Sequence, residues 1–354
     1  TPGFQHIQIK KLHPTFGAEV SGVDFSKEIP SEIFDEILEA LIKYAVCVYR
    51  DTGLDDRRHV EFSTRFGELD DIKPYLTKEG IQAESFDMNT SSCLTQEMLT
   101  TKEKSWHQMI QDHSTAKYFP CHVSRCQMSK LPQRAILLFH VDSSFNPRRA
   151  SYSLLRGVIL PPPETGGNID FADTRTAYDE LPKSTKEKLL KEDYVVAHSF
   201  HHSRKIAAPE FFKDLDPRSI KMSKHKLLQV HEPSGRMNLY IASHAHHIEG
   251  LPKEQSDSLL RELMVHCTQG KYTFSVQWRQ PGDLIIWDNT CCLHRSGAIE
   301  GGYVRDMRRT TVHDGSSMAW GMNREGERKQ GFTVGRMGMM PERESWVEKD
   351  KVVV

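Results

Sequence analysis

The stretch GDLIIWDNTCCLHR, residues 282–295, decides how the fold of this chain is interpreted. Its apolar run follows the turn residues Pro281-Gly282-Asp283 and predicts a buried β-strand over 284–289, with His294 just beyond it. Further short strand-like runs lie at 135–141, 152–160, 166–173, 274–278 and 303–312. Several short strands with few long helices favour a barrel or sandwich.

A few segments carry the periodicity of helices instead. Apolar residues at helical spacing predict a helix over 31–44, with Ser31 as its N-terminal cap. Helices are also predicted over 55–66, which Gly67 ends, over 185–191, and over 253–267, where apolar residues again recur at helical spacing. The fold class predicted from these patterns is mainly β with flanking helices.

Composition excludes several classes of function. Lys and Arg number 47 and Asp and Glu 48, so the formal net charge of −1 gives no field that would attract nucleic acid or an anionic membrane. No run approaches the length of a transmembrane helix, and the first ten residues contain no apolar secretory segment. Seven cysteines, an odd number, argue against a disulfide scaffold and for a reducing compartment, so we expect a cytoplasmic protein.

The whole chain, 1–354, is expected to form a single domain with two unusual regions. Residues 87–131 are polar and irregular, which indicates an insertion or lid. Residues 315–354 form a C-terminal extension rich in Gly and Met. A tail, a lid and a subunit contact all remain open for this extension, and the last would make the protein a homo-oligomer.

The triplet His140-Val141-Asp142 comes at the end of an apolar run. Residues i and i+2 of a strand share a face, so the imidazole and the carboxylate converge as two metal ligands would. Alone the triplet is weak, and a structural His–Asp pair would be the default interpretation. His294 completes a set of two histidines and one carboxylate, which suits non-haem Fe(II) better than zinc.

Two arginines strengthen this hypothesis. If 303–312 is a strand, Arg305 and Arg309 lie on one side of it together with Met307. Charges turned into a barrel are unfavourable unless they are paired, and the arginine fork matches a carboxylate. The alternative is that both arginines face solvent. With the metal ligands present, binding of anionic ligands is the favoured interpretation.

These residues belong to a longer resemblance, which runs from about residue 10 to 314 with an interruption at 87–131. The chain resembles the TauD/TfdA family of Fe(II)- and 2-oxoglutarate-dependent dioxygenases. The matching segments are HPTFGAEVSGVDFS (13–26), RFGELD (65–70), HVDSSF (140–145), GGNIDFADTRTAYDELP (166–182), SGRMNLYIASHAHHIEGLP (234–252), GDLIIWDNTCCLHR (282–295) and RDMRRTTV (305–312).

The resemblance implies a double-stranded β-helix, which is a jelly-roll, cupin-like core with iron at its mouth. It implies that His140, Asp142 and His294 are the catalytic iron ligands. It implies that Arg305 binds the distal carboxylate of 2-oxoglutarate and that Arg309 binds the acidic group of the substrate. It also implies that Trp287 lines the cosubstrate pocket. The cofactors implied are Fe(II), 2-oxoglutarate as cosubstrate, and O2.

The implied reaction is oxidation of an unactivated C–H bond of a small acid, such as an amino acid or an aromatic carboxylate. Succinate and CO2 are released, and the outcome is hydroxylation, or desaturation or cyclisation. Two alternatives remain beside it: a cupin-like metalloenzyme that does not use 2-oxoglutarate, and a non-catalytic ligand-binding barrel. The sequence identifies no nucleic-acid or membrane partner, only a small acidic substrate.

The sequence departs from the family pattern at positions that contact the cosubstrate or the primary substrate in relatives. Ile169 stands where relatives usually have a threonine whose hydroxyl contacts the cosubstrate, and the neighbouring Asp170 should point to the opposite face. Phe139 replaces a common tryptophan, and the apolar residues 135–138 replace a segment with a substrate-binding asparagine. A less polar substrate pocket is therefore expected. The histidines at 244, 246 and 247 are assigned to the scaffold, and those at 198, 201 and 202 to the surface or to the surroundings of the site.

Overall fold

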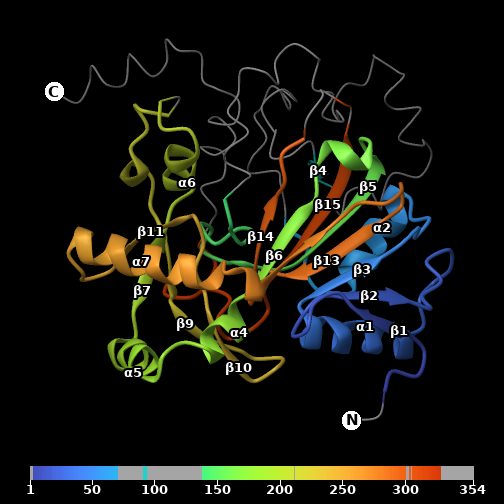
Figure 1. The fold of residues 1–354 in the computed structure, drawn as a ribbon, viewed down its shortest axis with the longest axis horizontal. Coiled ribbons are helices and arrows are strands. Elements are labelled where there is room, and N and C mark those ends of the chain that lie inside the picture. The colour runs from blue at the N-terminus through green and yellow to red at the C-terminus, as the bar shows by residue number, and fades with distance from the viewer. Residues whose placement is uncertain are drawn as a thin grey trace.

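A computed structural model describes residues 3–70, 91–93, 138–210, 212–299, 303 and 305–327 of the chain. Several mostly antiparallel sheets are combined with helices in a mixed α/β arrangement (Figure 1). Most of the expected insertion, 87–131, lies outside the described residues, as does the C-terminal extension beyond residue 327.

The largest sheet has seven strands in the order β1-β2-β3-β13-β5-β15-β4. Its pairs are antiparallel except β2–β3 and β15–β4, which are parallel. The strands are β1 (Gln8–Lys11), β2 (Ala18–Ser21), β3 (Val46–Tyr49), β13 (Leu284–Asp288), β5 (Ala150–Ile159), β15 (Asp306–His313) and β4 (Ser91–Cys93). β4 is the part of the expected insertion that the structure describes, and it extends the sheet beside β15.

Three smaller sheets complete the β structure. One has the order β12-β6-β14, formed by β12 (Thr273–Val276), β6 (Ile169–Asp173) and β14 (Cys292–Ser296). The others are β11-β7-β8, formed by β11 (Ala245–Ile248), β7 (Val195–His198) and β8 (Ser223–Lys226), and the hairpin of β9 (Leu228–His231) with β10 (Arg236–Leu239).

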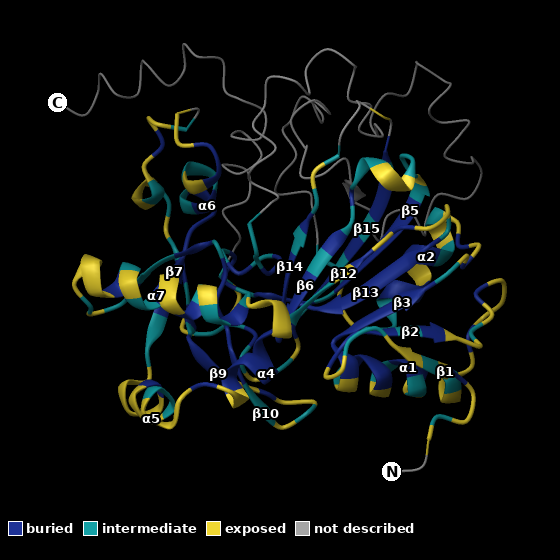
Figure 2. Cartoon of the chain, in the orientation of Figure 1, coloured by how far each residue is buried: buried dark blue, intermediate teal, exposed yellow. Residues whose placement is uncertain are grey.

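Strand β13 is apolar throughout because both of its faces are covered. Leu284 and Ile286 pack into the apolar cluster beneath helix α1 (Ser31–Tyr44). Ile285 and Trp287 point the other way and pack against the sheet of β6, where Phe171 joins them. Figure 2 shows this buried interior running through the strands at the centre of the molecule. The predicted strand over 284–289 is confirmed, and its continuous apolar run reflects two-sided burial.

The other helices are α2 (Asp56–Thr64), α4 (Thr174–Asp179), α5 (Lys183–Glu192), α6 (Phe200–Ala207) and α7 (Lys253–Cys267), with short 3-10 turns η6 (Pro163–Thr165), η7 (Pro217–Ser219) and η8 (Gly270–Tyr272). The four predicted helices are therefore confirmed. The cap predicted for α1 is wrong, because Ser31 is the first helical residue and Pro30 precedes it without a side-chain hydrogen bond.

Two predicted strands differ from the structure near their functional residues. Leu138–Val141, the described part of 135–141, forms no strand, and His140 makes only an isolated bridge with His294. Arg305 lies just before β15 and not within it. In both places the chain leaves regular pairing where a side chain turns toward the site described below.

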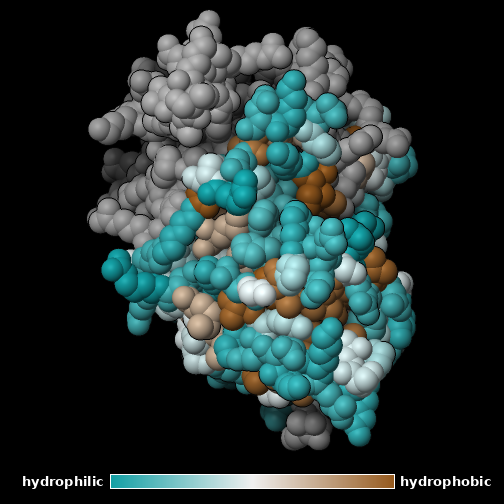
Figure 3. Space-filling model, turned by 90° about the vertical axis from the view of Figure 1, so that its left-hand side faces the viewer, coloured by the Kyte–Doolittle hydropathy of each residue, from teal (hydrophilic) through white to brown (hydrophobic). Residues whose placement is uncertain are grey.

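The C-terminal extension begins as part of the folded body. Ala319 is buried, and its carbonyl accepts a hydrogen bond from the backbone of Arg149 at 3.0 Å. The Asn323 amide donates to the carbonyls of Pro147 and Lys224, each at 3.1 Å. None of the described helices is long and apolar enough to cross a membrane. The face drawn in Figure 3 is largely hydrophilic, with smaller apolar areas between polar ones.

Candidate active site

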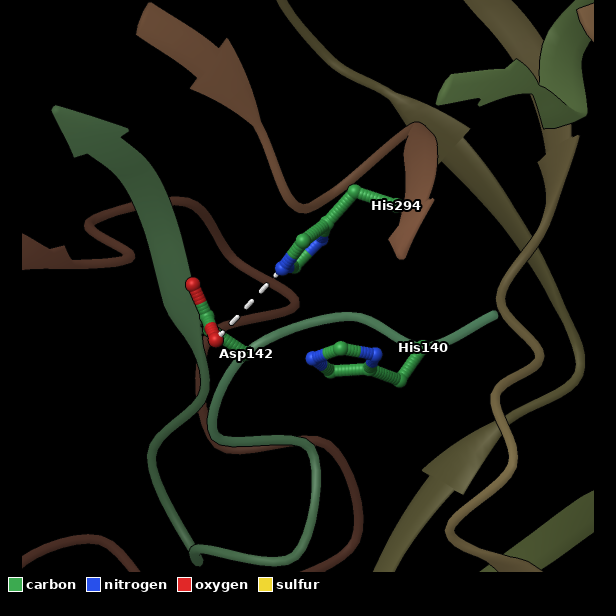
Figure 4. Close-up of side chains that lie close together, drawn as sticks. All are labelled: His140, Asp142 and His294. Atoms are coloured by element: carbon green, nitrogen blue, oxygen red, sulfur yellow. Dashed lines mark ion pairs between the residues drawn. The ribbon is translucent and has the colours of Figure 1, made fainter. Parts of the chain in front are cut away.

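The structure brings His140 and Asp142 together with His294, which is far from them in the chain (Figure 4). Each residue can offer one ligand atom, and these atoms lie within 4.8 Å of one another. The imidazole and carboxylate groups point toward a common space in Figure 4. The predicted convergence is therefore present, and the donor set of two nitrogens and one carboxylate oxygen fits a divalent transition metal.

A reciprocal pair of backbone hydrogen bonds holds the two histidines opposite each other. His140 N donates to His294 O at 2.9 Å, and His294 N donates to His140 O at 2.8 Å. The Nδ1 of His140 lies 2.8 Å from the carbonyl of Leu138 and must donate to it, because a carbonyl can only accept. The proton is thereby placed on Nδ1, which leaves the Nε2 lone pair of His140 available to a metal.

His294 is buried and electrically neutral in the folded protein. Burial, followed by the neighbouring His140, lowers the pKa of His294 to about 3. Its Nε2 faces Asp142 Oδ1 at 3.8 Å, and the ring lies 4.8 Å from that of Trp287. Among the described residues, its Nδ1 has no hydrogen-bond partner. A neutral imidazole is the form that binds a metal. Protons should therefore compete little with a metal for His294.

Asp142 remains ionised because the Arg309 cation, the two neighbouring histidines and a hydrogen bond from Ser153 favour its charged form. Burial alone would raise its pKa, but Arg309, His294 and His140 outweigh burial and hold the pKa well below the usual range. The Nη1 of Arg309 donates to Asp142 Oδ1 at 3.2 Å. The predicted substrate arginine therefore lies directly against the candidate metal site.

Arg305 is a buried cation with little compensation. It is 6% exposed, and burial lowers its pKa to about 10. Its Nη2 donates to the carbonyl of Gly167 at 3.1 Å. No carboxylate pairs with it within the described part of the chain. The alternative of two solvent-facing arginines is wrong, because the side chain of Arg309 is also only 15% exposed.

The space between the arginines is apolar. Met307 is fully buried in the cluster that also contains Ile169 and Trp287. Asp170 points away from this cluster and pairs with Arg295 at 2.9 Å, as expected from strand alternation. Asp170 therefore does not replace the missing threonine at position 169.

Sequence reasoning assigned His244 to the scaffold, yet its ring lies 5.7 Å from that of His140. Its Nδ1 is 2.8 Å from Ser203 Oγ, whose own proton is donated to the carbonyl of Phe200. His244 must therefore donate through Nδ1, and burial beside His140 holds its pKa well below the usual value. His198 is also fully buried, which excludes the surface and leaves the surroundings of the site as the alternative for it. Strand alternation could not reveal either position, because both depend on how distant segments pack.

A second cluster of potential ligands, His231, Asp288 and Cys291, is better explained as a structural ion pair. His231 Nε2 lies 2.9 Å from Asp288 Oδ2, and its Nδ1 lies 2.6 Å from Ser234 Oγ. Both ring nitrogens are thus engaged by protein groups. The cluster ties the β9–β10 hairpin to the end of β13.

Paired histidines, a carboxylate and a buried cation on a β framework define a metal-dependent enzyme that binds small anions. The comparison with known families is specific. The model described as "Taurine catabolism dioxygenase TauD, TfdA family" matches residues 8–311, which is most of the chain. The chain belongs to this family and is a 2-oxoglutarate-dependent dioxygenase. This result favours the predicted activity over both alternatives, the metalloenzyme without 2-oxoglutarate and the non-catalytic barrel.

Individual relatives agree with this assignment. The chain is 30% identical to the α-ketoglutarate-dependent 2,4-dichlorophenoxyacetate dioxygenase of Cupriavidus pinatubonensis, covering 86% of this chain and 96% of that protein. It is 26% identical to the (S)-phenoxypropionate/α-ketoglutarate dioxygenase of Sphingobium herbicidovorans, over 82% and 89% of the two chains. The crystal structure of AAD-2 with Mn(II) and N-oxalylglycine is similar with a TM-score of 0.64 and 28% identity, over 88% and 99% of the chains.

Proposed function

We propose that the chain is an Fe(II)- and 2-oxoglutarate-dependent dioxygenase that oxidises an unactivated C–H bond of a small organic acid. His140, Asp142 and His294 would hold the iron through two nitrogens and one carboxylate oxygen. Bound iron, with 2-oxoglutarate and O2, supplies the oxidation and releases succinate and CO2. The protein's own contribution is to bind and orient the two acids and to keep the site dry.

The observation that carries this proposal is the buried guanidinium of Arg305, which contacts the turn just before β6. A buried cation without a carboxylate partner among the described residues is unfavourable until an anion binds. The distal carboxylate of 2-oxoglutarate would supply that anion, with Gly167 keeping one face of the guanidinium in place. Trp287, packed against His294, would form an apolar wall of the same pocket.

Arg309 would bind the acidic group of the primary substrate. Its contact with Asp142 places this acid next to the metal, which would bring the substrate carbon within reach of the oxidant. The rings of Phe145 and Phe200 pack against His244, whose ring lies 5.7 Å from that of His140. We favour an aromatic carboxylate over an amino acid, because two relatives are named for aryloxyalkanoic acids and because Arg309 would repel an ammonium group.

The sheets on either side of the site would correspond to the family's double-stranded β-helix. One would be the large sheet around β13, and the other the sheet β12-β6-β14, with their shared apolar cluster between them. The ligands lie at one end of this cluster, and Arg305 contacts the chain just before β6. This arrangement supports one domain for the described residues.

The test is succinate release with Fe(II), 2-oxoglutarate and a panel of carboxylates, phenoxyacetates, sulfonates and amino acids. Mass measurement of the consumed compound distinguishes hydroxylation from desaturation or cyclisation. In Arg305→Leu, loss of a charge-assisted contact should raise the half-saturating 2-oxoglutarate concentration about 10- to 100-fold. In Arg309→Leu, the half-saturating concentration of the primary substrate should rise instead. Succinate release that does not depend on Arg305 would contradict the proposal.

A further inference from the structure

The two carboxylate oxygens of Asp142 have different surroundings. Oδ1 lies on the side of the candidate metal site, 3.8 Å from His294 Nε2 and 3.2 Å from Arg309 Nη1. Oδ2 is turned away from it and accepts a hydrogen bond of 2.7 Å from Ser153 Oγ in strand β5. The carboxylate is thus held so that one oxygen faces the histidines and the other faces the sheet.

The direction of the Ser153 hydrogen bond is fixed by Asn289. The Asn289 Nδ2 group donates to Ser153 Oγ at 3.0 Å and to the carbonyl of Ser151 at 2.9 Å. An amide NH2 can only donate, so Ser153 Oγ is an acceptor in that contact. Its own proton is then free for Asp142 Oδ2, which is closer and charged, rather than for Thr311 Oγ1 at 3.4 Å.

The orientation of the Asn289 amide is fixed as well. Its Oδ1 accepts from the backbone N–H of Asp142 at 3.0 Å and from the indole N–H of Trp287 at 3.1 Å. A flipped amide would direct an NH2 group at two N–H donors. All four of these contacts are buried, so each unmade bond would be unfavourable. Asn289 therefore holds both the backbone of Asp142 and the serine that binds its side chain.

We propose that Ser153 and Asn289 are positioning residues that restrict Asp142 to binding the metal through one oxygen. Carboxylates bind metals through either one or both oxygens, and Ser153 holds the second oxygen of this one. A six-coordinate metal with two histidines and one carboxylate oxygen keeps three positions open. A carboxylate bound through both oxygens would take one of the positions that 2-oxoglutarate and O2 need. This inference rests on the proposed metal site.

The test uses Mn(II) as the probe and requires no turnover. The full chain is titrated with Mn(II), and the water molecules on the bound ion are counted from the relaxation of water protons. The native protein should show three waters. Ser153→Ala should show two and a Kd for Mn(II) about 10-fold higher, and the Kd of N-oxalylglycine for the Mn(II)-loaded protein should rise as well.

Two variants on the same strand serve as controls. Ser153→Thr retains the hydroxyl and should restore the native water count. Ser151→Ala removes a buried hydroxyl on the same face, which donates to backbone carbonyls of β15 and does not touch Asp142. It should behave as the native protein. An unchanged water count in Ser153→Ala, or the same loss in Ser151→Ala, would overturn the proposal.

Failure of the metal site itself gives a different result. If His294→Ala binds Mn(II) as tightly as the native protein, the three residues are not the ligands and the proposed function fails with them. If His294→Ala abolishes binding while Ser153→Ala retains both the native affinity and three waters, the metal site stands and only the role of Ser153 is refuted.

Discussion

Arg309 contacts the candidate metal ligand Asp142 and is also the residue proposed to bind the substrate. Its removal should therefore strengthen metal binding and weaken substrate binding. Its guanidinium lies 3.2 Å from Asp142 Oδ1, where its positive charge opposes a metal cation. We expect Arg309→Leu to bind Mn(II) several-fold more tightly than the native protein while its KM for the acidic substrate rises.

The measurement is Mn(II) affinity by titration, beside substrate kinetics. Arg309→Lys should keep the metal affinity near native, because it keeps the charge, and should recover only part of the substrate binding, because it loses the planar fork. Weaker Mn(II) binding in Arg309→Leu would contradict this electrostatic account and point to a packing role for the arginine.

At this same residue scale, the sequence revealed groups that bind and missed groups that orient. His140 and Asp142 were found because they follow an apolar run, and the two arginines because a strand would place both on one side. Ser153 gave no signal, since a serine inside a β-strand pattern has many ordinary explanations. Its role depends on a hydrogen bond to a carboxylate in another segment and on Asn289 from a third. Such contacts arise from tertiary packing alone.

Among the elements, the turn that leads into β6 places Gly166 and Gly167 in left-handed conformations, with φ of 94° and 79°. A Cβ at Gly166 would lie 2.1 Å from the backbone carbonyl of Ala298, which cannot move independently of its chain. The next residue supplies the carbonyl that binds Arg305. Gly166→Ala should therefore reduce stability and also weaken 2-oxoglutarate binding.

Gly235→Ala is the matched control for this turn. Gly235 also has a positive φ, 67°, but nothing lies within 4 Å of its added Cβ. Gly235→Ala should lower the free energy of unfolding by about 1 kcal/mol, because alanine adopts a positive φ less readily than glycine. It should leave the affinity for 2-oxoglutarate unchanged. Urea unfolding and 2-oxoglutarate titration compare the two variants. Equal losses of stability would show that the contact with Ala298 relaxes.

The elements themselves were largely predictable, and their pairing was not. An apolar run located β13, and helical spacing located α1 and α7, because these signals are local. The parallel pairing of β4 with β15 joins distant parts of the chain that carry no complementary pattern. The bridge between His140 and His294 is equally non-local. The presence of several β-strands with helices beside them was therefore accessible from sequence, while the mixed α/β balance and the geometry of the site required the structure.

Over the whole molecule, buried neutral histidines are concentrated to an unusual degree. Burial, aided by nearby arginines or histidines, lowers the pKa values of His59, His225 and His294 to about 3. Burial beside other histidines also places those of His198 and His244 well below the usual 6.5. His231 is the opposite case: burial opposes its charge, but Cys291 and Asp288 raise its pKa to about 10.

The sign of the resulting pH dependence follows from proton uptake on unfolding. Below pH 6.5 the unfolded chain protonates these histidines while the folded chain keeps them neutral, so stability is lost as pH falls from 6.5 toward 3. His59, His225 and His294 together should remove about 4 kcal/mol for each pH unit in this window. His231 contributes stability that is present below pH 6.5 and lost as pH rises toward 10.

Because small domains are stable by only about 5–15 kcal/mol, the metal-free protein should unfold in mild acid, near pH 5. Urea unfolding from about pH 7.5 to about pH 5, in the presence of EDTA, measures this slope. His59→Gln should reduce the slope of unfolding free energy against pH by about 1.4 kcal/mol per pH unit, because one titrating group is removed. Ser256→Ala removes a buried hydroxyl that accepts a hydrogen bond from the backbone N–H of Ile248, and it should lower stability equally at every pH. A slope that His59→Gln leaves unchanged would show that His59 is already protonated in the folded protein.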